Sequence, residues 1–313
     1  MLQYLVVLLD DISIPFCHAD NPLKSKRLIN IGVLKEAIIF GMKNNLMIQY
    51  VLPEYNLPEE YFNVMEYIDN VKIGRDVKVY NSIPLRAEKD IIVLRINIED
   101  FINSTMMVAN LIQQTKRISI IFTNIHEFNR SSSEPYLNAL NSLHDTILTE
   151  TSEGKSPQIN ILTDRLNLSK MSNCGAGDTN ITIAPNGKFY ICPAFYYDER
   201  KGLDSNINYA FCIVDRSVGD LKSGINIKNK RLLTLDCSPL CNICDAYHCS
   251  RCVWLNSKLT NEVNTPSFQQ CLVSNIERNS SMLLAAKMRE QGFNAEIINE
   301  IDYIDTFDKF MEL

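Results

Sequence analysis

The distribution of the cysteines constrains this chain more than any other feature of its sequence. Nine of its ten cysteines lie between Cys174 and Cys271, and the stretch 236–252, DCSPLCNICDAYHCSRC, holds five of them. Asp10 and Asp11 end the apolar N-terminal run early, and no basic segment or cleavage site accompanies it, so we expect no signal peptide. In the reducing cytosol that this implies, structural disulfides are rare. The clustered thiols therefore predict metal ligation and not a disulfide framework.

The first 165 residues alternate between two kinds of segment. Apolar runs predict strands at 4–10, 46–53, 76–80, 90–97, 118–125 and 158–164. Helical spacing and helix-start residues predict helices at 31–45, 58–70, 104–117 (capped by Ser104) and 133–150 (capped by Ser133). This alternation is typical of βαβ units with a parallel sheet, either open or closed into a partial barrel. Sites in such sheets lie at the carboxyl ends of strands, so Cys17 and His18 are expected near one of them.

The sequence changes character after about residue 170. The stretch 178–197 predicts a β-hairpin, because alternating apolar residues lead into the turn Asn186-Gly187 and a second apolar run follows it. The stretch 275–313 is expected to be mostly helical, and its last segment places Ile297 and Ile301 on one face. No glycine-rich phosphate-binding motif is present.

The cysteine spacing in 236–252 is compatible with more than one centre. Two C-x2-C pairs, Cys241/Cys244 and Cys249/Cys252, fit an Fe–S cluster or a zinc ribbon-like site almost equally well. Cys237 extends the first pair to C-x3-C-x2-C, which matches the cluster-binding motif of radical SAM enzymes.

The wider arrangement separates these possibilities, because it resembles the SPASM domain of radical SAM peptide-modifying enzymes. That family has a Cys, a Gly-x4-Cys, a C-x2-C-x5-C-x3-C block and a last Cys. This chain has the same order, with two inner spacings one residue short, in Cys174, Gly187, Cys192, Cys241, Cys244, Cys249, Cys252 and Cys271. The likeness covers residues 170–275, about a third of the chain.

The resemblance implies two auxiliary [4Fe–4S] clusters. Carried over position by position, the ligands of the second cluster are Cys241, Cys244, Cys249 and Cys271. The ligands of the first cluster are Cys174, Cys192 and Cys252. Cys237 and Cys212 are the candidates for its fourth ligand, unless that position stays open to a substrate.

A radical SAM cluster, by contrast, is not expected. In that family the three-cysteine motif follows the first strand of an N-terminal barrel, but only 69 residues follow Cys244 here. The corresponding stretch after the first predicted strand, DISIPFCHADNP, has a single cysteine, Cys17. The N-terminal half thus resembles a short radical SAM barrel without its cluster, and SAM is not expected to bind in the usual way.

The sequence as a whole resembles the CXXX repeat peptide maturases, which are associated with radical SAM enzymes and with short precursor peptides. The stretches that carry this likeness are YLVVLLDDISIPFCHADNP and NCGAGDTNITIAPNGKFYICPAFYY. The expected fold is α/β, with a degenerate radical-SAM-like β/α domain at 1–168, a SPASM domain with a hairpin at 169–275 and a helical segment at 276–313.

Composition excludes some classes of protein. The net charge is −6 and no block of lysines and arginines stands out, so a nucleic-acid partner is disfavoured. No apolar run has the length of a membrane span, and we expect a cytoplasmic protein.

Other residues could take part in a site. His248 could replace a cysteine on a cluster, but the cysteines suffice, so a place beside the ligands or on the surface is favoured. Cys17 with His18 could act as a nucleophile pair, although a buried structural thiol is the commoner case. Trp254 and the aromatic run 195–197 are expected to shield the clusters. His126 and His144 show no obvious partner.

Three functions remain open at this point. In the first, the chain binds two clusters and a ribosomally synthesised, Cys-containing precursor peptide, and works beside a separate radical SAM enzyme that supplies the radical. In the second, it is an independent Fe–S enzyme that uses an open cluster position or Cys17. In the third, the thiolates bind Zn²⁺ and only stabilise an interaction protein.

Overall fold

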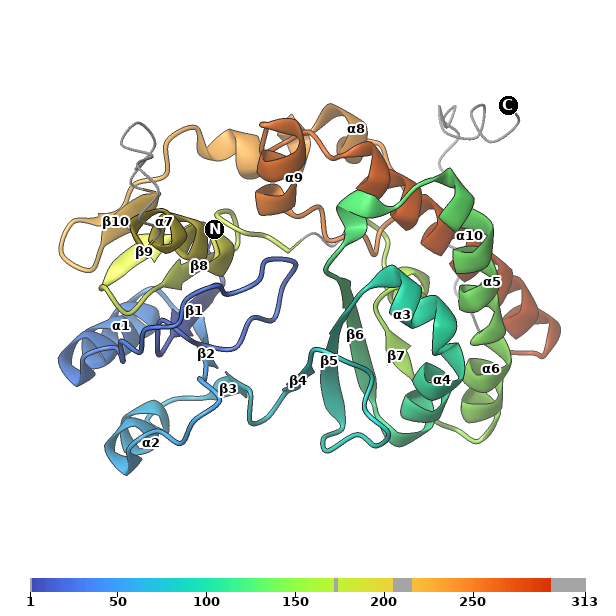
Figure 1. Ribbon diagram of the computed structural model, residues 1–313, viewed down its shortest axis with the longest axis horizontal. Coiled ribbons are helices and arrows are strands. Elements are labelled where there is room, and N and C mark those ends of the chain that lie inside the picture. The colour runs from blue at the N-terminus through green and yellow to red at the C-terminus, as the bar shows by residue number, and fades with distance from the viewer. Residues whose placement is uncertain (1, 172–173, 205–215, 294–313) are drawn as a thin grey trace. The chain divides into compact units, whose positions relative to one another are not determined.

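The computed structural model describes residues 2–171, 174–204 and 216–293, which form two compact units (Figure 1). Each unit combines two separate stretches of the sequence. The first unit contains Met1–Val79 and Cys174–Thr234, and the second contains Tyr80–Asn173 and Leu235–Leu313. The domain boundaries predicted from the sequence, after residues 168 and 275, remain predictions. Within the described ranges, none of the helices combines the length and apolar character needed to cross a membrane.

A mixed sheet forms the centre of the first unit. Among the described residues it has seven strands in the order β11-β10-β9-β8-β1-β2-β3. β1 pairs in parallel with both β2 and β8, β2 pairs in parallel with β3, and the remaining neighbours pair antiparallel. The strands are β1 (Tyr4–Leu8), β2 (Met47–Val51), β3 (Asn70–Ile73), β8 (Asn180–Ile183), β9 (Lys188–Tyr190), β10 (Ser217–Asp220) and β11 (Gly224–Ile225).

Two predicted helices, at 31–45 and 58–70, are present in the first unit together with two helical segments that were not predicted. They are α1 (Ile31–Lys43), α2 (Glu59–Met65), α7 (Pro193–Asp204) and the 3-10 turn η4 (Lys230–Leu233). The side chain of Asn30 caps α1 by accepting from the Gly32 N–H at 2.8 Å. A Cβ at Gly41 would lie 2.7 Å from the Ile48 side chain, so this glycine lets α1 approach β2 closely.

The second unit has a smaller parallel sheet. Its order in the described residues is β4-β5-β6-β7, and β5 pairs in parallel with β6, as β6 does with β7. The strands are β4 (Lys78–Tyr80, where the chain passes into this unit), β5 (Ile91–Ile96), β6 (Arg117–Phe122) and β7 (Gln158–Ile159). Their inward side chains, such as Ile92, Leu94 and Ile120, belong to one continuous apolar core.

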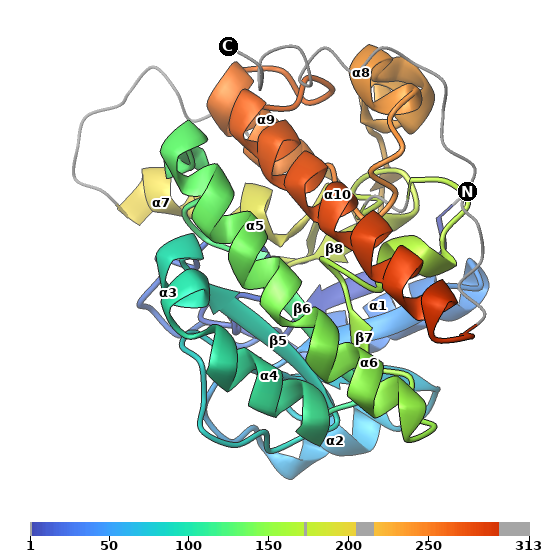
Figure 2. The ribbon, with the colours of Figure 1, turned by 90° about the vertical axis from the view of Figure 1, so that its right-hand side faces the viewer.

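Helices cover one face of this sheet, and α10 lies beside α5 (Figure 2). The helices are α3 (Ile98–Asn103), α4 (Thr105–Gln114), α5 (Ser133–Ser142), α6 (His144–Ser152), α8 (Pro239–Asn242), α9 (Val253–Thr260) and α10 (Phe268–Glu290). The 3-10 turns are η1 (Ile125–Glu127), η2 (Arg130–Ser132), η3 (Asp164–Asn167) and η5 (Leu235–Cys237). The Ser267 side chain caps α10 by accepting from the Gln270 N–H at 3.2 Å.

The predicted α/β class with parallel strands is confirmed. The hairpin is confirmed as β8 and β9, and Gly187 in its turn has φ +75°, a value that favours glycine. Four details were wrong. Strand β3 and helix α3 were not predicted, and one helix was predicted across α5 and α6, which separate at Leu143. The aromatic run 195–197 lies in α7 and not in the hairpin.

The predicted caps were wrong in their contacts. Ser104 stands before α4 but its side chain makes no capping hydrogen bond, and Ser132, not Ser133, precedes α5. The predicted terminal helix with Ile297 and Ile301 lies outside the described residues.

Candidate metal centre

The two predicted ligand sets differ in where the structure places them. No disulfide joins any of the nine described cysteines, and Cys212 lies outside the described residues. The whole second set, Cys241, Cys244, Cys249 and Cys271, belongs to the second unit. The first set draws on both units, since Cys174 and Cys192 belong to the first while Cys237 and Cys252 belong to the second. Its assembly remains a prediction.

Three thiols of the second set influence one another. Burial raises the pKa of Cys241 to about 12, the thiols of Cys249 and Cys244 add to the rise, and Arg251 opposes it. Burial likewise raises the pKa of Cys249 to about 11, with Cys244 among the lesser causes. Neighbouring buried thiols resist ionisation because thiolates repel one another in a poorly solvated site. Cysteines bind a metal as thiolates, so the positive charge of a bound centre would favour the ionised form that burial disfavours here.

Helix α10 brings the fourth member of the set to the same neighbourhood. Cys271 lies in its first turn, and Ser274 follows three residues later on the same helix face. The Ser274 side chain is hydrogen-bonded to the Cys249 thiol. The helix that carries Cys271 therefore also contacts Cys249, through Ser274.

The spacing of these thiols bears on the kind of centre they can hold. Within the described ranges, no three His, Cys, Asp or Glu side chains converge tightly enough to share one metal ion. A tetrahedral zinc site needs such convergence. Thiolates that bind different irons of one cluster stand farther apart, and the donor set is all sulfur. An all-sulfur donor set suits an Fe–S cluster and a zinc site alike, so the kind of centre is left to the proposal below.

A buried ion network anchors the segment between Cys244 and Cys249. Asp245 accepts from Arg165 Nη2 and from Arg278 Nη1, each at 2.9 Å. Arg165 Nε also donates to the Asp245 carbonyl at 3.2 Å, and its guanidinium lies over the Tyr247 ring at 5.7 Å. The network ties the cysteine segment to η3 and α10. None of these three charged residues stood out in the sequence.

Arg251 is a fourth charged residue that the sequence did not single out. It lies between Cys249 and Cys252, is 1% exposed, and adopts a left-handed backbone with φ +42°. Its guanidinium donates to the Ser238 hydroxyl. A buried cation beside the thiols favours their ionised form, which is the form that binds iron.

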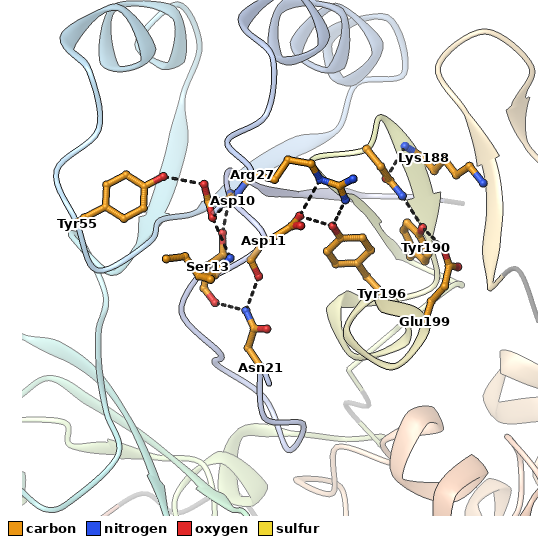
Figure 3. Close-up of polar contacts among 12 residues, drawn as sticks. Asp10, Asp11, Ser13, Asn21, Arg27, Tyr55, Lys188, Tyr190, Tyr196 and Glu199 are labelled. Atoms are coloured by element: carbon orange, nitrogen blue, oxygen red, sulfur yellow. Dashed lines mark hydrogen bonds and ion pairs between the residues drawn. The ribbon is translucent and has the colours of Figure 1, made fainter. Parts of the chain in front are cut away.

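Polar contacts tie together the loop after β1, where a radical SAM cluster would be expected (Figure 3). The Tyr55 hydroxyl donates to Asp10 Oδ2 at 2.7 Å. Asp11 accepts from Arg27 Nε at 3.2 Å and from the Tyr196 hydroxyl. Burial is the main cause that raises the pKa of both phenols, so they stay protonated donors. Both carboxylates are buried, and they tie the loop to Tyr55 in the segment after β2 and to Tyr196 in α7.

The remaining residues that the sequence singled out are found in both units. Cys17 is half-buried in the loop after β1. Tyr196 contacts Asp11 and Arg27, and the shielding of a cluster by the aromatic run remains a prediction. Trp254 packs against the core of the second unit, and Lys258 lies over its ring at 5.9 Å. His144 is buried and bonded to Ser280, and His126 forms an exposed ion pair with Glu127.

Comparisons with known proteins add information on the fold. No protein-family model and no curated protein matches the chain. Its fold is similar to that of histidine-tagged anSMEcpe with bound AdoMet, with a TM-score of 0.58 and 12% identity over 92% of this chain and 99% of that one. It is also similar to "Native anSMEcpe with bound AdoMet and Kp18Cys peptide", with a TM-score of 0.56 and 10% identity over 91% and 99%. The chain thus shares the mixed α/β fold of these two structures.

Proposed function

We propose that this chain is an Fe–S protein of peptide maturation. It holds two [4Fe–4S] clusters, binds a Cys-containing precursor peptide and works beside a separate radical SAM enzyme. The observation that carries the proposal is the second set of cysteines. Three of them interact, and the fourth shares a face of α10 with the serine that contacts Cys249.

The bound clusters would supply electron transfer, and the chain's own residues would hold and surround them. Cys241, Cys244, Cys249 and Cys271 would ligate the second cluster. Cys174, Cys192 and Cys252 would ligate the first, with Cys237 or Cys212 as its fourth ligand or with that position open to a peptide thiolate. The Asp245 network keeps the cysteine segment on α10, and Arg251 offsets negative charge there.

The loop after β1 supports a division of labour with a second enzyme. It has one cysteine where SAM binding through a cluster needs three, and its carboxylates are engaged by Tyr55, Arg27 and Tyr196. The partner would therefore provide the radical. The peptide is proposed because two of the similar solved structures are described as holding a peptide, Kp18Cys or Cp18Cys.

The first experiment measures iron in protein purified without oxygen. Two [4Fe–4S] clusters give about eight irons per chain. A colourless protein with one or two zinc ions would refute the proposal and support the zinc-stabilised alternative.

The second experiment tests the division of labour. The iron-loaded chain should not cleave SAM reductively by itself, and it should restore peptide modification when it is added to a radical SAM enzyme that binds it. Peptide modification by the isolated chain would instead establish the independent Fe–S enzyme. A Cys17→Ala variant then shows whether that thiol takes part.

A further inference from the structure

Two histidines of the second unit are buried against α10 in similar ways. His248 Nε2 lies 2.9 Å from Glu277 Oε2, and His144 Nε2 lies 2.9 Å from the Ser280 hydroxyl. Both imidazoles leave a buried Nδ1 with no hydrogen-bond partner among the described residues. They differ in two respects, because His248 adjoins Cys249 in the sequence and has a carboxylate as its partner. His144 thus provides a matched comparison within the same unit.

Glu277 is a buried carboxylate with both oxygens occupied. Its side chain is 6% exposed, Oε2 contacts His248, and Oε1 accepts from the Tyr136 hydroxyl at 2.7 Å. A buried carboxylate is costly unless it is hydrogen-bonded, and two donors here offset that cost. With a carboxylate as acceptor, Nε2 of His248 carries the proton.

The position of Glu277 on α10 relates it to the predicted ligands. Cys271, Ser274 and Glu277 follow one another at intervals of three residues, so each lies beside the next and the series turns by about 120° around the helix. Ser274 contacts the Cys249 thiol, and the charge of Glu277 acts on that thiol as well. This part of α10 therefore presents a predicted ligand, a contact to a second ligand and a carboxylate that holds the neighbouring histidine.

We infer that Glu277 is a positioning residue for the second cluster, which rests on the function proposed above. Through His248 it fixes Cys249 relative to α10, the helix that carries Cys271. Its negative charge also opposes the addition of an electron to the cluster. Hydrogen bonds and charges around the ligands are the means by which a protein sets the potential of an Fe–S cluster.

The test uses the full chain, loaded with iron without oxygen. Cys271→Ala identifies the electron paramagnetic resonance signal of the second cluster as the one it removes. The midpoint potential of that signal is then measured in Glu277→Gln, which keeps the shape of the side chain and removes its charge. Iron retention against a chelator is measured in Glu277→Leu, which removes both bonds, and in His248→Gln, which keeps a donor near the position of Nε2. His144→Gln is the matched control.

The expected result is a higher potential in Glu277→Gln with its iron retained. Glu277→Leu should hold the second cluster about 10- to 100-fold more weakly, as is typical when a residue that orients a ligand is lost. His248→Gln should retain more iron than Glu277→Leu, and His144→Gln should change neither readout. A merely structural role for Glu277 would leave the potential of Glu277→Gln at the wild-type value.

Two outcomes separate the inference from the proposed function. In the first outcome the wild-type chain binds iron, the midpoint potential of Glu277→Gln equals that of the wild type, and Glu277→Leu retains iron as well as the wild type does. The inference is then overturned and the proposed function stands. If the wild-type chain binds no iron, both are overturned together.

Discussion

Replacing Asp245 with alanine should destabilise the second unit severely. The substitution removes the carboxylate that pairs with two largely buried guanidinium groups, those of Arg165 and Arg278, whose side chains are 3% and 11% exposed. Breaking a buried ion pair by removing one partner costs about 3–5 kcal/mol, because the remaining charge keeps its desolvation penalty. Two charge-assisted hydrogen bonds of about 1.5–3 kcal/mol each give a similar total.

Urea unfolding of the full chain can measure this loss. The chain has one tryptophan, Trp254, and it lies in α9 of the second unit, so its fluorescence reports on that unit. With a slope of about 2 kcal/mol per molar urea, the midpoint should fall by about 2 M. Asp245→Asn keeps the volume and one acceptor oxygen, and its midpoint should fall between those of the wild type and Asp245→Ala.

The exposed pair between Asp90 and Lys116 provides the control. These side chains are 64% and 81% exposed, and solvent screens such a pair. Asp90→Asn should leave the urea midpoint unchanged within error. If Asp245→Ala unfolded at the same urea concentration as Asp90→Asn, the network would not anchor the cysteine segment and our account of its burial would be wrong.

Three further predictions concern other parts of the chain. Burial, with a smaller contribution from a nearby lysine, lowers the pKa of His144 to about 4. Between pH 6.5 and 4 the unfolded chain therefore binds more protons at this histidine than the folded chain does. At most about 3 kcal/mol of stability is present above pH 6.5 and should be lost as the pH falls to about 4. His144→Gln should flatten that part of the stability profile, measured by urea titrations at each pH. Tyr196→Phe removes a donor to the buried Asp11 carboxylate and should cost about 1–3 kcal/mol, measured by thermal unfolding, whereas an unchanged midpoint would show that the loop after β1 does not depend on it. Cys271→Ala should lose about half of the bound iron in metal analysis and Cys17→Ala none, and equal losses would contradict the ligand assignment.

Much of the fold could be predicted because the signals are local. An unbroken apolar run predicts β1, since parallel strands are buried on both faces, and Asn186-Gly187 predicts the hairpin turn. The break between α5 and α6 has no such signal, because Leu143 is apolar and continues the helical pattern while it is fully buried. Strand β3 was missed because only its last two residues are buried, so its four residues show neither an apolar run nor clear alternation.

In the candidate site, too, only the features with a local sequence pattern could be predicted. Cysteine spacing is a local pattern, and it led to a ligand set that the structure places in one unit. The groups that hold this set come from distant positions, as with Arg165 and Asp245 or His248 and Glu277. Charged residues of this kind look like ordinary surface residues until the packing is known. One sequence feature could have indicated the buried polar groups: the largely polar run from 274 to 281 on α10, which is almost entirely buried.

The interleaved order of the two units has a consequence for synthesis on the ribosome. Strand β1 pairs with β8, so the centre of this sheet cannot form until Asn180, the partner of Tyr4, has been synthesised. The second unit begins near residue 80 but lacks α10 until residue 290 has been made. Long intervals between pairing partners slow folding and leave apolar edges exposed in the nascent chain. Neither unit can therefore be released as a finished intermediate, and under the proposed function iron would be inserted only after translation has passed α10.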